Sequence, residues 1–89
     1  MKVHVVTKTT FIPNGNGKNI TAVFGAYSSK KKAVAAVDER LNESVDVLQK
    51  YGYSRRDTVV LGISTWGYDL VDQNGGLRSR YVIETMEVE

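Results

Sequence analysis

The chain has 89 residues, of which 42% are hydrophobic and 25% charged, a composition typical of one small globular domain spanning residues 1–89. It contains no cysteine and one histidine, His4, which excludes disulfides, thiolate nucleophiles, cysteine-ligated metals and histidine clusters, and we expect no cofactor. The formal net charge of +2 is too small by itself to indicate nucleic-acid binding. Because the sequence has neither an apolar run of membrane-spanning length nor a signal-peptide core, we expect a cytoplasmic protein without membrane association.

The charges are distributed unevenly along the chain. Residues 1–37 carry six lysines and no acidic residue, whereas residues 38–89 carry six basic and ten acidic residues. Such an asymmetry can create a surface of one sign even when the net charge is small. The lysine-rich N-terminal half therefore leaves nucleic-acid binding open as an alternative function.

The first third of the chain is predicted to form a β-hairpin. The segment from Val3 to Thr10 is rich in the β-branched residues that favour strands. Residues 13–18 form a dense cluster of turn-forming residues, including the only proline. The segment Asn19–Tyr27 alternates between two faces, as a strand does.

A helix is predicted over residues 29–51. Ser28 and Ser29 offer side-chain oxygens for the helix start, and Gly52 suits the left-handed residue that ends many helices. Apolar residues recur at helical spacing between these limits. The predicted inner stripe consists of Ala33, Val37, Leu41, Ser44, Val45 and Leu48.

The last third is predicted to return to strands. Thr58–Trp66 alternates well, and Gly67 interrupts the pattern, so residues 68–72 are either a further strand or a bent continuation. Residues 73–76 are a strong turn signal, and Leu77–Val88 forms a long closing strand.

Together these elements predict an α+β fold with an antiparallel sheet of four strands, optionally five, and one helix on one face, in the order β-β-α-β-β. A helix about 10 Å wide covers only part of a sheet whose strands lie about 4.8 Å apart. Neighbouring pairs such as Val5 with Val6, and Val82 with Ile83, give both sheet faces apolar character. We therefore expect the second face to pack against a second copy of the chain or a partner protein. The alternative is a curled sheet covered by its own long side chains.

Two groups of basic residues are candidate anion or nucleic-acid contacts. Lys30, Lys31 and Lys32 lie in the first turn of the predicted helix, where free backbone N–H groups favour anions. Arg55 and Arg56 follow the helix and would extend such a patch. The alternative interpretation is a solvated lysine face, because runs of like charge usually have that role.

Three aromatic residues are candidate protein contacts. Trp66 and Tyr68 flank Gly67, and Tyr27 ends the second predicted strand. Tryptophan and tyrosine dominate interface hot spots, although a corner of the core is the alternative place for them.

The sequence offers no catalytic constellation. His4 lies in a predicted strand without a nucleophile motif, and residues 15–18 lack the spacing of a phosphate-binding loop. We therefore expect a protein that is not an enzyme.

Three stretches carry a resemblance to a family of small phage and Gram-positive bacterial proteins. Lys2–Thr7, Val23–Ala36 and Tyr81–Glu89 resemble that family's "VYVVT" strand, "VFSSKEKA" strand-to-helix junction and "Y-I-E-x-x-E-V-E" closing strand. The resemblance implies a small ββαβ-type domain of phage or prophage origin, with no established activity or site residues to transfer. The chain departs from the family over Ser54–Ser79, which leaves an added strand there open.

The sequence thus predicts a non-enzymatic protein-interaction module, phage- or prophage-related, that forms a homodimer or binds a protein partner. Nucleic-acid binding through the lysine-rich half is the alternative and is not favoured.

Overall fold

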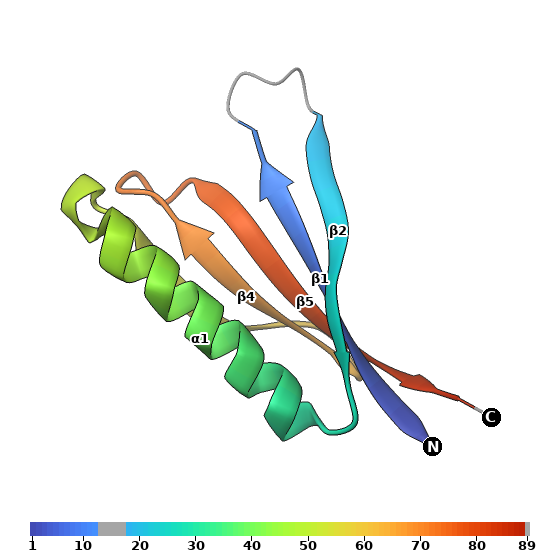
Figure 1. Cartoon of the computed structure of the whole chain (residues 1–89). Helices are drawn as coiled ribbons and strands as arrows, with labels where there is room; N and C mark the ends of the chain where they lie inside the picture. Colours follow the sequence, from blue (N-terminus) through green and yellow to red (C-terminus); the bar gives the residue numbers. More distant parts are fainter. Residues whose placement is uncertain (13–17, 89) are drawn as a thin grey trace.

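The computed structural model describes residues 1–12 and 18–88, apart from the side chains of residues 58 and 59 (Figure 1). Residues 13–17 of the predicted turn lie outside this description. Over the described residues, one helix lies across one face of a five-stranded antiparallel sheet. In chain order the elements are β1 (Lys2–Phe11), β2 (Asn19–Tyr27), α1 (Lys30–Leu48), the single 3-10 turn η1 (Gln49–Tyr51), β3 (Ser54–Gly62), β4 (Thr65–Val71) and β5 (Leu77–Glu87).

The order of strands across the sheet is β2-β1-β5-β4-β3. The closing strand β5 pairs with β1 on one side and with β4 on the other, so the two terminal segments lie at the centre of the sheet. The edges of the sheet are β2 and β3.

The predicted α+β fold of order β-β-α-β-β is wrong. The described elements follow the order β-β-α-β-β-β, and more than half of the chain lies in strands. The predicted strand Thr58–Trp66 crosses a tight turn at Ile63 and Ser64, and Gly67 lies inside β4. The error arises because apolar alternation continues through the turn, where Ile63 is fully exposed, so the pattern contains no break.

The local signals at both ends of the helix are confirmed. The Ser29 hydroxyl accepts a hydrogen bond from the backbone N–H of Lys32 at 3.2 Å, which satisfies one free donor of the first turn. After η1, Gly52 has a φ of 82°, in the left-handed region that glycine adopts without steric cost.

The core lies between α1 and the sheet. Of the predicted stripe, Ala33, Val37 and Leu41 are buried, whereas its C-terminal members Ser44, Val45 and Leu48 are half-buried. The three buried residues pack against side chains from three strands. The buried cluster is completed by Val6, Tyr68, Leu70, Tyr81 and Ile83.

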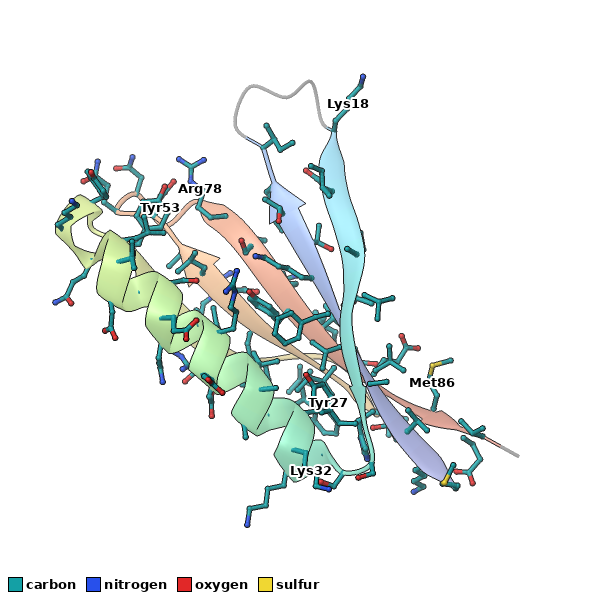
Figure 2. All side chains as sticks on the ribbon, viewed as in Figure 1. Lys18, Tyr27, Lys32, Tyr53, Arg78 and Met86 are labelled. Atoms are coloured by element: carbon teal, nitrogen blue, oxygen red, sulfur yellow. The ribbon has the colours of Figure 1, made fainter. Side chains whose placement is uncertain are left out.

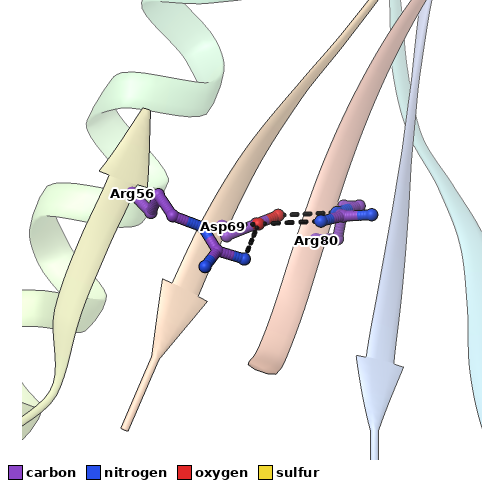
Figure 3. Close-up of polar contacts among 3 residues, drawn as sticks. All are labelled: Arg56, Asp69 and Arg80. Atoms are coloured by element: carbon purple, nitrogen blue, oxygen red, sulfur yellow. Dashed lines mark hydrogen bonds and ion pairs between the residues drawn. The ribbon is translucent and has the colours of Figure 1, made fainter. Parts of the chain in front are cut away.

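The sheet face opposite the helix carries a buried carboxylate. Asp69 alternates with the core residues Tyr68 and Leu70, so it lies on the other face of β4, where none of its surface is exposed. Arg80 Nε donates to Asp69 Oδ1 at 2.7 Å, and Arg56 Nη2 donates to Oδ2 at 2.8 Å (Figure 3). Burial alone would raise the pKa of Asp69, but the hydrogen bonds from Arg80 and Arg56 outweigh it and lower that pKa.

Candidate protein-interaction site

The three predicted anion-binding lysines have separate surroundings at the start of α1. The ammonium of Lys30 lies 3.3 Å from the ring centroid of Trp66, a cation–π contact. The ammonium of Lys32 donates to the Ser28 hydroxyl at 3.3 Å, and Lys31 is exposed.

Two other lysines of the N-terminal half, Lys8 and Lys18, do not join this group. Lys18, directly before β2, and Lys32 lie at opposite ends of the molecule (Figure 2). The ammonium of Lys8, within β1, lies 5.5 Å from the ring centroid of Tyr81. These two lysines therefore do not extend the group of lysines at the helix start.

Arg55 and Arg56 contact carboxylates on opposite sides of the sheet. Arg55 faces the helix, where Nη2 donates to Asp38 at 2.6 Å and Nη1 donates to Asn42 at 2.7 Å. Arg56 binds Asp69 on the other face. Neighbouring residues of a strand point in opposite directions, so these two arginines do not form one patch.

The predicted interface aromatics lie in or against the core. Tyr68 is buried, with 8% of its surface exposed. Trp66 and Tyr27 are half-buried and pack against the core cluster. Little of Tyr68 is therefore available to a partner.

The most exposed apolar feature is the edge strand β2, which the sequence analysis did not single out as a site. Seven of its nine residues are exposed, and the strand contains no charged residue. Ile20, Val23 and Phe24 carry the exposed apolar surface, and Val23 is 70% exposed. The sequence alone shows that this strand has no charged residue. That the strand lies at an edge follows only from the order of strands in the sheet.

The outer side of β2 has no strand partner among the described residues. Its backbone pairs with β1 on one side only, and the strand runs along the margin of the sheet (Figure 1). Its free N–H and C=O groups can pair with an added strand. The opposite edge, β3, carries Arg55, Arg56 and Asp57, and charges of this kind discourage edge pairing.

A β-bulge divides β2 into two parts. Val6 opposes Gly25 and Thr7 opposes Val23, which leaves Phe24 as the extra residue. The Phe24 ring turns to the helix side and meets Tyr81 edge-on, with ring centroids 5.3 Å apart. Asn19–Val23 therefore remains a regular strand with an open outer side.

A groove runs between β2 and the outer side of α1. It has a volume of about 270 Å³ and combines apolar and charged walls. Arg40 and Glu43 form an exposed ion pair of 3.7 Å there. The lining residues are Phe24, Tyr27, Ala36, Glu39, Arg40 and Glu43.

A larger cleft of about 590 Å³ lies at the other end of the helix, where Tyr53 and Arg78 meet (Figure 2). Arg78 lies 5.9 Å from the Tyr53 ring centroid, and its Nε is 3.2 Å from the Asp72 carboxylate. Backbone N–H groups of Asn74 and Gly76 also bind this carboxylate. These contacts hold the turn between β4 and β5.

His4 and the acidic residues are the side chains that bear on the predictions about catalysis and metal binding. His4 Nδ1 lies 3.0 Å from the hydroxyl of Thr85 on the neighbouring strand. Within residues 1–12 and 18–88, no group of three His, Asp or Glu side chains is placed to hold a metal ion. In the same part of the chain, no helix has the length and apolar character needed to cross a membrane.

No protein family, curated protein or solved structure matches this chain. The resemblance to phage and Gram-positive bacterial proteins therefore stays a prediction. The exposed edge strand β2 and the groove beside it are therefore the candidate binding surface.

Proposed function

We propose that the protein is a non-enzymatic interaction module that binds an extended protein segment along β2. The observation that carries this proposal is the combination of an open sheet edge with an uncharged, exposed strand. An added strand gains main-chain hydrogen bonds from such an edge, and its side chains select the partner.

The two sides of β2 suit different side chains of the added strand. On the helix side, Ile20 and Ala22 precede Phe24, and Phe24 lines the groove beside α1. On the opposite side, Thr21 and Val23 offer a small polar and an apolar contact. An added strand with apolar side chains toward the groove would remove this surface from water.

The dispersion of the basic residues also supports a protein partner over a nucleic acid. Strong nucleic-acid binding needs several cations that reach neighbouring phosphates. Lys30 already makes a cation–π contact with Trp66. Arg55 already donates hydrogen bonds to Asp38, Asn42 and Asp57.

The proposal is tested with a strand-forming peptide unrelated to the chain. A soluble peptide of the length of β2, alternating Thr and Val and ending in lysines, is titrated into isotope-labelled protein, and backbone amide shifts are recorded by NMR. We expect the shifts to concentrate in residues 19–24.

Val23→Lys places a charge in the middle of the edge and should abolish these shifts. Val47→Lys is the matched control, because Val47 is 68% exposed on α1 and lies outside the groove. Shifts centred on β3, or equal binding by the two variants, would contradict the proposal.

A further inference from the structure

We infer that the strand bound by β2 is β2 of a second copy of this chain. This inference rests on the proposed function and names its partner. The dimer joins two sheets edge to edge about a two-fold axis, so that the same surface of each copy forms the contact.

The charge pattern of β2 favours pairing with itself. In a symmetric antiparallel pair, the paired residues of the strand meet residues of the same strand in the other copy. The absence of charge from Asn19 to Tyr27 means that no like charges are opposed. A pair formed by β3 would bring Arg55, Arg56 and Asp57 into the contact.

The bulge selects the register of this pairing. The regular part, Asn19–Val23, is centred on Thr21, so Thr21 of one copy opposes Thr21 of the other. In this register Asn19 faces the second copy's Val23, and Ile20 faces its Ala22. A register centred on Val23 would place the extra residue Phe24 inside the paired stretch, opposite Ala22, whereas centring on Thr21 leaves it just outside that stretch.

The same register provides a charged contact at each end. Lys18 directly precedes β2 and is exposed. Counting from Thr21, Lys18 comes opposite the second copy's Phe24. Phe24 lines the groove that also contains Glu39, and the ion pair of Arg40 with Glu43. Glu39 is the groove's carboxylate without an ion-pair partner among the described residues, and Lys18 would approach it from the other copy, twice in each dimer.

The test uses the absence of cysteine, which allows single-cysteine variants without side reactions. Sedimentation from micromolar to millimolar concentration should show a reversible dimer. After mild oxidation, Thr21→Cys should form the covalent dimer, because directly opposed residues have Cα atoms within about 4.4–6.8 Å, as a disulfide requires.

Val23→Cys and Leu61→Cys are the controls. In the proposed register the two Val23 residues lie about 13 Å apart along the strands, four residues at about 3.3 Å each. Leu61, on the other edge, is 45% exposed and should remain uncrosslinked. Faster crosslinking by either control than by Thr21→Cys would overturn the proposed pairing.

The charged contact is tested separately. Lys18→Glu should weaken the dimer about tenfold, because two attractive contacts become repulsive. Lys31→Glu, an exposed lysine on α1, should change it less than twofold. Equal changes in dimer affinity for the two variants would show that Lys18 does not contact the second copy.

The failure of the dimer and the failure of the proposed function give different results. A protein that stays monomeric at all concentrations overturns the inference, whereas peptide-induced shifts in β2 would still support strand addition. Loss of both the dimer and the peptide shifts would overturn the two proposals together.

Discussion

Lys30 and Trp66 form a contact that joins two surfaces the sequence suggests as separate sites: the Lys30 ammonium lies 3.3 Å from the centroid of the indole ring. The lysine gains a favourable partner at a helix start, where the helix dipole disfavours positive charge. The indole in turn is covered on one face. Both side chains thus have a structural role where α1 meets β4.

Lys30→Gln should remove this contact and lower the free energy of unfolding by about 0.5–1 kcal/mol. Trp66 is the only tryptophan, so its fluorescence reports the change directly, and we expect emission at longer wavelength as water reaches the ring. Lys31→Gln controls for the loss of a positive charge near the helix start. Identical emission and stability in the two variants would show that the contact contributes nothing.

Asp69→Asn should lower the free energy of unfolding by about 2–4 kcal/mol, measured by denaturant unfolding. The substitution leaves Arg56 and Arg80 without their shared carboxylate, and Asp69 is fully buried. The value lies below that of a fully buried pair because the Arg56 side chain is 54% exposed. Asp46→Asn, on the exposed side of α1, should change stability little.

The stability of the protein should decrease as the pH falls through about 4. The folded pKa of Asp69 is lowered below its ordinary value of 3.8, so protonation of the carboxylate favours the unfolded chain. Its stabilising contribution is fully present above that value and is lost as the pH falls through the lower folded pKa. Thermal unfolding between pH 2 and 7 should show a shallower acid slope for Asp69→Asn than for the wild type. An unchanged slope would show that Asp69 does not control acid stability.

Leu41→Ala should lower the free energy of unfolding by about 2–4 kcal/mol, because Leu41 is fully buried between α1 and the sheet. Val47→Ala, on the outer side of the same helix, should cost far less. Denaturant unfolding of the two variants tests the orientation of the helix. Similar losses would contradict the helix placement.

Local signals were sufficient to predict several elements correctly. The Ser29 hydroxyl and Gly52 mark the two ends of the helical region, and alternation fixes Asn19–Tyr27 as a strand. These signals depend on residues close in sequence. The turn at Ile63 and Ser64 has no such local signal, so the sequence does not predict it.

Features that depend on the order of the strands could not be read from the sequence. Asp69 meets Arg56 and Arg80 only because β4 lies between β3 and β5, and each partner is more than ten residues away in sequence. The edge position of β2 has the same origin. The sequence shows that β2 has no charged residue, but this matters for pairing with another strand only because β2 lies at a sheet edge.

Amide hydrogen exchange along β2, recorded at low and at high protein concentration, tests whether β2 pairs with a second copy of the chain. We expect exchange in residues 19–23 to slow at high concentration, because outward-facing N–H groups gain partners in the added strand. Exchange in β3 should not change. Exchange in β2 that is independent of concentration, or protection that appears in β3 instead, would show that β2 is not the edge that pairs.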